Sequence, residues 1–337
     1  MAMKDIVTIG GSLGSSAALK RVLSDIPADF PAAVLIATHM AESSSGYLAE
    51  ALAGHSALPV GQAMDGQPVE QGHVYVAAPN RHLLVDGGTI LLGTGPRENM
   101  ARPAVDALFR SAALSFGPRV VGLVLSGLLN DGASGLHAIK AMGGTAIVQD
   151  PFDAQARDMP LAALQTVEVD HVGPADQLAG LLRQVVREEA GPAIAAPLDL
   201  QLEVSIATGQ RAGSEQLRTL GEPVPLSCPH CQGVLSEMKD GKPLRFRCQI
   251  GHAFTAEAMI ASAEAGVGDA IRIAMRLMEE RVELVSRMSR DARESGRPAV
   301  AELYEARAVE YAGYAATLRR AATLDLQAAR QAGDAEV

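Results

Sequence analysis

The sequence predicts an α/β domain with a doubly wound, mostly parallel sheet, followed by a small cysteine-bearing module and a pair of C-terminal helices. Three observations predict this order. Short apolar runs alternate with helical segments from Lys4 to about Val186, as in successive βαβ units. Three cysteines, two of them in a Cys-x-x-Cys, come after this region. Apolar side chains then recur every three or four positions toward the end of the chain, which is the spacing of amphipathic helices.

Length and composition set limits on the class of protein. The chain has 337 residues, 48% of them hydrophobic, which is enough for one large core with appended modules. Its formal net charge of -10 at pH 7 argues against the clustered basic surface that nucleic-acid binding requires. No apolar stretch of about 18 residues exists to span a bilayer, and no apolar segment of a signal peptide precedes the first strand. We therefore expect a cytoplasmic protein that binds no nucleic acid and is not inserted in a membrane.

The strands of the α/β domain are predicted from near-continuous apolar runs, which are typical of a parallel sheet covered on both faces. These runs span residues 6–9, 32–37, 120–125 and 145–148. A shorter strand over 73–76 and a hairpin over 82–86 and 89–92, turning at Gly87-Gly88, complete the set. Helices are predicted over residues 17–23, 47–53, 103–115, 133–142 and 175–187.

A sharp, glycine-rich turn over residues 10–14 follows the first strand and contains Ser12. A serine on a strand-to-helix turn exposes its hydroxyl at the carboxyl edge of a sheet, beside backbone N–H groups that can stabilise an oxyanion. Ser12 is therefore a candidate nucleophile. The same turn is also compatible with an N-cap serine or with a phosphate-binding or dinucleotide-binding loop.

Two further polar residues follow strands at the same predicted edge. His39 lies in the Thr38-His39-Met40 segment that ends the strand over 32–37, and Asp131 lies in the loop after the strand over 120–125. A serine hydroxyl needs an imidazole to take its proton, and the imidazole needs a carboxylate to fix its tautomer. Taken singly, a histidine at a strand end is often a core or loop residue, and Asn-Asp-Gly is most often a turn or helix cap. Together the three residues favour a hydrolase.

Five motifs, in this order, resemble those of the CheB chemotaxis methylesterase family. They are IGGSLG (9–14), THM (38–40), RPAVDALF (102–109), LSGLLNDGA (125–133) and MP (159–160). The resemblance covers roughly residues 4–187. It implies a doubly wound α/β catalytic domain that hydrolyses glutamate methyl esters on the cytoplasmic domain of chemoreceptors, releasing methanol, and that can deamidate receptor glutamines.

The resemblance also implies a role for each candidate residue. Ser12 corresponds to the nucleophile, His39 to the general base and then acid, and Asp131 to the carboxylate that orients His39. Backbone N–H groups of Leu13 and Leu128 are the expected oxyanion donors. No cofactor is expected for catalysis. The implied partner is a methylated chemoreceptor or a related signalling protein.

Some positions depart from the pattern of the family. Leu13 follows the serine, Ser15 stands where a second glycine is common, and Leu129 stands where the aspartate loop usually carries glycine. These changes surround the reacting groups without removing them. Enzymes of the family usually carry an N-terminal receiver domain, and because the first catalytic strand begins at once we expect no phosphorylation control in cis.

Two other classes of function are compatible with parts of the sequence. The main alternative is a non-catalytic CheB-like interaction module in a signalling complex, which the altered serine turn permits. A nucleotide-binding oxidoreductase is the weaker alternative, because the Gly-x-Gly-x-x-Gly spacing is not met and the second strand ends in His39 instead of an acidic ribose ligand.

A second chemical motif is CPHC (228–231), followed after sixteen residues by Cys248 and then by His252. Each pair can supply two metal ligands around a tight turn, as tetrahedral zinc requires. We predict structural zinc on Cys228, Cys231, Cys248 and His252, with His230 as a weaker alternative ligand. Four protein ligands leave no open position for catalysis. A redox pair of thiols is the competing interpretation.

The predicted domains are a catalytic domain over 1–187, a linker over 188–226, a zinc-ribbon-like module over 227–256 and a helical hairpin over 257–332. The module is predicted to contain strands over 234–238 and 244–247 with a turn at Asp240-Gly241. In the linker, residues 198–206 fit both a strand and a helix, and 207–221 is predicted to be loop-like. Gly296-Arg297-Pro298 separates the last two helices, which we expect to serve as a docking or regulatory element.

Overall fold

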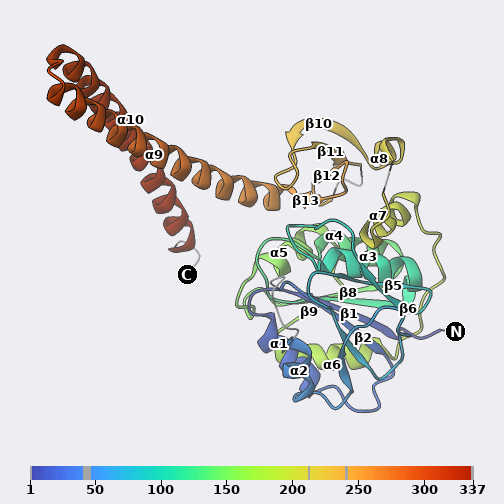
Figure 1. The fold of residues 1–337 in the computed structure, drawn as a ribbon. Helices are drawn as coiled ribbons and strands as arrows, with labels where there is room; N and C mark the ends of the chain where they lie inside the picture. Colours follow the sequence, from blue (N-terminus) through green and yellow to red (C-terminus); the bar gives the residue numbers. More distant parts are fainter. Residues whose placement is uncertain (1, 41–46, 212, 240–241, 335–337) are drawn as a thin grey trace. The chain divides into compact units, whose positions relative to one another are not determined.

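The structure is a computed structural model that describes residues 2–40, 47–211, 213–239 and 242–334 (Figure 1). The chain divides into two compact units, Met1–Met259 and Ile260–Val337. None of the helices within the described ranges combines the length and the apolarity needed to cross a bilayer.

The first unit is built on a seven-stranded sheet in the order β3-β4-β2-β1-β7-β8-β9. Every neighbouring pair in this sheet is parallel, so the prediction of a doubly wound parallel sheet is confirmed. The strands are β1 (Ile6–Gly11), β2 (Ala33–Thr38), β3 (Val60–Gln62), β4 (Val74–Val76), β7 (Val120–Val124), β8 (Thr145–Gln149) and β9 (His171–Gly173). The two edge strands, β3 and β9, were not predicted because each has only three residues and no apolar run.

Two hydrophobic cores lie on the two faces of this sheet. One core joins strand side chains such as Val7 and Ile9 to α1 (Ser15–Ser24), α2 (Tyr47–Ala53) and α6 (Ala175–Val185). The other joins side chains such as Leu35 to α3 (Val105–Phe116), α4 (Ala133–Ala141) and α5 (Asp158–Thr166). Figure 1 shows the two groups of helices on opposite sides of the strands. A short 3-10 turn, η1 (Gly117–Arg119), leads from α3 into β7, and α5 was not predicted from the sequence.

An antiparallel hairpin of β5 (His82–Asp86) and β6 (Thr89–Gly93) packs beside α3. Asp86 pairs with Thr89, so the predicted turn at Gly87-Gly88 is confirmed, and both glycines have positive φ. A left-handed backbone at both central turn positions is the reason glycine is favoured there.

The segment predicted as a linker contains α7 (Leu198–Thr208), α8 (Ser214–Leu220) and β10 (Gly221–Ser227). In α7 the buried face is formed by Leu200, Glu203 and Ile206, while Leu198 is 81% exposed. The prediction of a loop over 207–221 is wrong. The Gln216 side chain accepts the Gly213 N–H at the start of α8, and Leu217 and Leu220 bury its apolar face.

A four-stranded antiparallel sheet follows, in the order β10-β11-β12-β13. Its remaining strands are β11 (Val234–Met238), β12 (Arg245–Cys248) and β13 (Ala253–Thr255). The predicted hairpin of the small module is therefore confirmed in its strands. Its predicted turn at Asp240-Gly241 lies outside the described residues.

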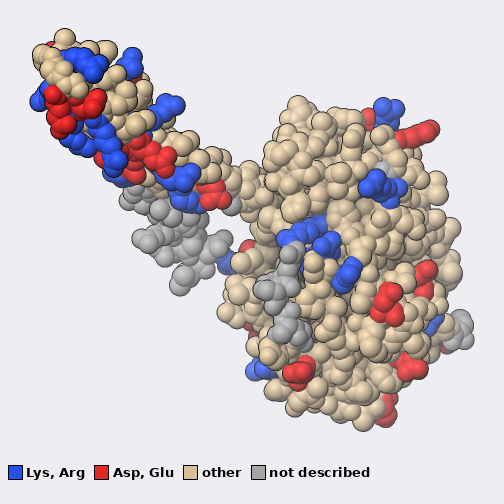
Figure 2. Space-filling model, viewed as in Figure 1, with Lys and Arg blue, Asp and Glu red and all other residues tan. Residues whose placement is uncertain are grey.

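The second unit is a helical hairpin of α9 (Ala256–Glu294), which begins in the first unit, and α10 (Pro298–Asp334). The two helices are antiparallel, and ion pairs join them between Arg293 and Glu305 and between Arg319 and Glu279. Gly296, with φ +71°, forms the break that was predicted between the helices. Figure 2 shows side chains of both charges interspersed along this hairpin.

Candidate active site

Three loops meet at the carboxyl edge of neighbouring strands β2, β1 and β7. Ser12 follows β1, His39 follows β2, and Asp131 lies in the loop after β7. Backbone bonds tie these loops together: the His39 N–H donates to the Gly11 carbonyl at 3.3 Å, and the Ser12 N–H donates to the Ser126 carbonyl at 2.9 Å. One open pocket is lined by Ser12, His39, Met40, Asn99, Met100, Ala101, Leu128, Leu129 and Asp131. The fold therefore brings the three predicted residues together.

His39 and Asp131 form the central polar contact of this pocket. The His39 Nε2 lies 2.7 Å from Asp131 Oδ2. The Asp131 side chain is completely buried, whereas that of His39 is 24% exposed. Because Nε2 is engaged with the carboxylate, Nδ1 is the ring nitrogen left to act on another group.

Asp131 is held as a carboxylate by several donors. The N–H groups of Val105 and Asp106, at the start of α3, donate to its two oxygens at 2.7 and 3.1 Å. Burial alone would raise the pKa of Asp131, but the hydrogen bond from His39, its charge and these N–H groups lower that pKa to about 2. Asp131 is thus ionised at neutral pH and can stabilise a protonated His39.

A second buried carboxylate, Asp106, was not predicted as part of the site. Its Oδ1 accepts the N–H groups of Gly132 at 3.0 Å and Gly135 at 2.6 Å, so it fixes the loop that carries Asp131. Burial, followed by the nearby Asp131 charge, raises the pKa of Asp106 to about 7. A charged residue inside the apolar run of α3 was the signal in the sequence that could have identified it.

The positions that depart from the family pattern surround the pocket. Leu13 and Leu128, whose N–H groups were predicted as oxyanion donors, are 51% and 50% exposed. Leu129 has φ +60°, in the left-handed region that glycine adopts without strain. The buried Ser15 hydroxyl donates to the Ser12 carbonyl at 2.7 Å, so it tightens the serine turn.

A family model described as CheB methylesterase matches residues 7–182, which include Ser12, His39, Asp106 and Asp131. This chain belongs to the CheB methylesterase family.

Curated relatives and a solved structure agree with this assignment. A protein-glutamate methylesterase/protein-glutamine glutaminase 2 of Anaeromyxobacter dehalogenans is 39% identical over 183 residues, covering 54% of this chain and 54% of the relative. One of the same name from Methanosarcina mazei is 37% identical over 193 residues, covering 55% and 53%. The catalytic domain of the Thermotoga maritima CheB methylesterase matches with a TM-score of 0.52 and 31% identity, covering 54% of this chain and 98% of that domain. The chain spans about half the length of the two curated relatives.

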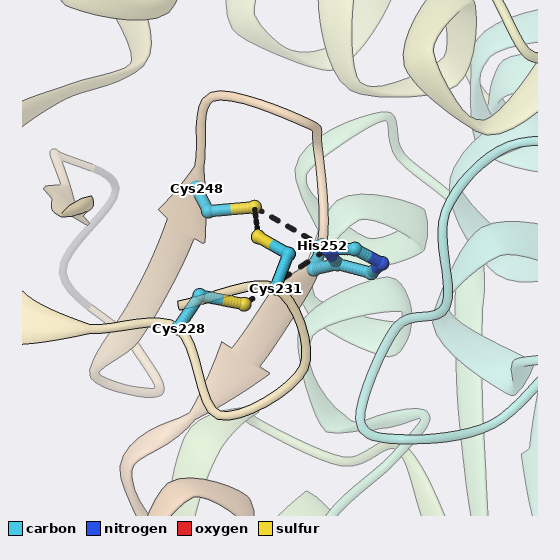
Figure 3. Close-up of side chains that lie close together, drawn as sticks. All are labelled: Cys228, Cys231, Cys248 and His252. Carbon is cyan, nitrogen blue, oxygen red and sulfur yellow. Dashed lines mark hydrogen bonds between the residues drawn. The ribbon is translucent and has the colours of Figure 1, made fainter. Parts of the chain in front are cut away.

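Beyond the CheB methylesterase domain, the four predicted metal ligands also come together (Figure 3). Their donor atoms all lie within 4.8 Å of one another. The Cys231 and Cys248 sulfurs are 3.6 Å apart, and His252 Nδ1 lies 3.4 Å from Cys248 Sγ and 3.9 Å from Cys228 Sγ. His230 is not in this cluster. Its ring centroid lies 4.4 Å from that of His252.

A buried network of five charged residues joins the cysteine-bearing module to the CheB methylesterase domain. Arg245 and Arg247, on β12, donate to Glu203 on α7 at 2.9 and 2.6 Å. Arg247 also donates to Glu98 at 3.3 Å, and Glu98 pairs with Arg110 of α3. All five side chains are at most 5% exposed. This network was not predicted from the sequence, because each of its residues, taken alone, is typical of an ordinary surface charge.

Proposed function

We propose that this chain is a serine carboxylesterase that hydrolyses glutamate methyl esters on chemoreceptors and releases methanol. The observation that carries the proposal is the common pocket of Ser12, His39 and Asp131 within the region that matches the CheB family. The names of its relatives support the reaction and its substrate class. We assign the activity to the cytoplasm, because the receptor segment that such enzymes modify is cytoplasmic.

In the first half of the proposed reaction, His39 Nδ1 takes the proton of the Ser12 hydroxyl as Oγ attacks the ester carbonyl. The Asp131 carboxylate, 2.7 Å from Nε2, favours the tautomer that carries its proton on Nε2 and leaves Nδ1 free to accept the serine proton. Once Nδ1 is protonated, the same carboxylate stabilises the imidazolium. When the tetrahedral intermediate collapses, the bond to the methoxy oxygen breaks. His39 returns its proton to that oxygen, and methanol leaves.

The second half hydrolyses the acyl-enzyme. A water molecule attacks the Ser12 ester carbonyl while His39 takes one of its protons, and the bond to Ser12 Oγ breaks as the proton returns to that oxygen. The product is a free glutamate side chain. The same steps with ammonia in place of methanol deamidate a glutamine.

The developing oxyanion needs donors beside Ser12. We propose the backbone N–H groups of Leu13 and Leu128, neither of which donates to another protein group among the residues that the structure describes. Because the contact is made by backbone, a leucine side chain at either position is compatible with it. Losing one such donor costs about a hundred- to a thousand-fold in turnover.

Labelling with a fluorophosphonate tests whether Ser12 is a nucleophile. We expect the wild type to be labelled at Ser12 and to hydrolyse a peptide that carries a glutamate γ-methyl ester. Both properties should be lost in Ser12→Ala and kept in Ser16→Ala, a control at an exposed serine four positions along the chain. A wild-type protein that shows neither property would favour the non-catalytic interaction module instead.

We also propose that the Cys3His cluster binds zinc. Tetrahedral zinc, with sulfur at about 2.3 Å and nitrogen at about 2.0 Å, places its donor atoms roughly 3.6–3.8 Å apart. The distance of 3.6 Å between the sulfurs of Cys231 and Cys248, and the distances of 3.4 and 3.9 Å from His252 Nδ1 to the sulfurs of Cys248 and Cys228, are close to these values, and all four donor atoms lie within 4.8 Å of one another. Bound by Cys228, Cys231, Cys248 and His252, zinc would supply a structural cross-link between two turns. Metal analysis of the purified full chain, with Cys248→Ser as the comparison, tests this assignment.

A further inference from the structure

Asn99 lies between the proposed catalytic carboxylate and the cysteine-bearing module. Its side-chain Nδ2 donates to Asp131 Oδ1 at 3.2 Å and to Asp106 Oδ2 at 3.1 Å. Its other groups bind strand β13: Asn99 Oδ1 accepts the Thr255 N–H at 3.0 Å, and the Asn99 N–H donates to the Ala253 carbonyl at 2.8 Å. Asn99 is only 6% exposed, so these bonds are shielded from water.

A second contact joins β13 to the loop of Asp131. The buried Thr255 hydroxyl donates to Asn130 Oδ1, and Asn130 Nδ2 donates to Glu257 at 2.6 Å. Asn130 directly precedes Asp131 in the chain. Strand β13 is therefore bound to Asn130, the residue before Asp131, and to Asn99, whose side chain donates to the Asp131 carboxylate.

The segment that carries Asn99 has a backbone conformation that needs outside support. Asn99 and Met100 have φ of +48° and +65°, two consecutive non-glycine residues in the left-handed region. Such conformations persist only where surrounding contacts fix them. The bridge between Glu98 and Ala253 of β13, and the ion pair between Glu98 and Arg247 of β12, supply such contacts.

The Cys3His cluster fixes β13 in turn. His252 immediately precedes Ala253, and Cys248 ends β12. The Cys248 N–H donates to the His252 carbonyl at 3.0 Å, closing the turn between the two strands. The predicted metal ligand His252 is therefore directly followed by Ala253, the β13 residue whose carbonyl accepts the Asn99 N–H.

From this chain of contacts we propose that the Cys3His module positions the active site: β13, fixed by the four ligands, holds Asn99, and Asn99 orients Asp131 toward His39. Metal bound to the cluster therefore sets the turnover of the esterase. The inference rests on the proposed esterase function. Asn99 is a positioning residue, since it acts through Asp131, and misplacement of a reacting group by about 1 Å can cost on the order of a hundred-fold in rate.

The test combines removal of the metal with Asn99→Ala in the full chain. Stripping zinc from the wild type with a chelator should lower kcat by about 10- to 100-fold with KM changed less than about two-fold, and stoichiometric zinc should restore it. Asn99→Ala should show the same loss of kcat while still binding one zinc per chain, which shows that its module is folded. Gln249→Ala is the control, because Gln249 is an exposed residue in the turn between β12 and β13. Its kcat and its zinc content should match those of the wild type.

Non-additivity is the decisive result. In the proposal the metal affects Asp131 only through β13 and Asn99. Removing zinc from the Asn99→Ala variant should therefore cause little further loss of kcat. Two losses that multiply, or a zinc-free wild type with full kcat, would overturn the inference.

Amide hydrogen exchange gives a readout that does not depend on activity. Removing zinc should speed exchange of the Thr255 and Asn99 amides, which are bonded between β13 and the Asn99 segment, and leave the Val34 amide of the central sheet unchanged. If these amides respond but no ester is hydrolysed, the proposed function fails and the structural coupling stands. If ester is hydrolysed and the amides do not respond, the coupling fails.

Discussion

Replacing Glu203 by glutamine should destabilise the first unit strongly. Glu203 accepts three hydrogen bonds from arginines of β12: Oε1 from Arg245 at 2.9 Å and Arg247 at 2.6 Å, and Oε2 from Arg245 at 3.1 Å. Burial would raise the pKa of Glu203, but the charges of Arg110, Arg245 and Arg247 hold that pKa well below its usual range. Glu203 is therefore ionised in the folded protein at neutral pH.

The size of the effect follows from what the substitution leaves behind. Glutamine keeps the shape of the side chain but removes its charge, so Arg110 and Arg247 keep Glu98 as an ionised partner, whereas Arg245 loses the carboxylate charge to which it donates two hydrogen bonds. Removing one partner of a buried ion pair costs about 3–5 kcal/mol, because the other charges stay buried without compensation. We expect a loss of this size in the free energy of unfolding.

Urea unfolding of the full chain at pH 7 measures this loss. Glu222→Gln is the matched control, because Glu222 pairs with Lys239 at 3.1 Å but is 73% exposed. An exposed pair contributes at most about 1 kcal/mol, so the control should unfold close to the wild type. A Glu203→Gln variant as stable as Glu222→Gln would refute the reasoning that this network holds the module on the domain.

Three other predictions concern the site. Leu129→Gly should raise the free energy of unfolding in urea by up to about 1 kcal/mol, because the strain energy relieved at a left-handed φ exceeds the entropic cost of ordering a glycine. An unchanged or lower free energy of unfolding would contradict this prediction. Asp106 has its pKa raised from 3.8 to about 7, so its contribution to stability is complete below pH 3.8 and is lost as pH rises through 7. Between pH 4 and 8 the wild type should therefore lose up to about 4 kcal/mol relative to Asp106→Asn, and parallel pH curves would contradict this. His39→Gln should abolish fluorophosphonate labelling of Ser12 without lowering the unfolding midpoint by more than a few degrees, and retained labelling would exclude His39 as the base.

The catalytic candidates could be predicted from sequence because strand order limits where strand ends lie. Ser12 and His39 directly follow buried strands, and the ends of parallel neighbours meet at one edge. The glycine usually found at Leu129 also has a physical explanation, the positive φ seen at that position. The positions of Ser12, His39 and Leu129 can thus be understood from the local sequence and from the parallel arrangement of the strands alone.

The contacts between the module and the catalytic domain could not be predicted in the same way. Arg247 and Glu98 are 149 residues apart, and Thr255 and Asn99 are 156 apart. No local pattern marks such pairs, because an isolated arginine or asparagine is most often solvated. The helix α7 shows a related limit: residues 198–206 fitted both a strand and a helix, and the face that packs includes Glu203, whereas Leu198 is exposed.

Methanol release from membranes that carry methylated chemoreceptors tests the central claim most directly. The wild type and Ser16→Ala should release methanol at equal rates, and Ser12→Ala should release it no faster than membranes without enzyme. Release by Ser12→Ala at the wild-type rate, or no release by the wild type, would contradict the proposed reaction.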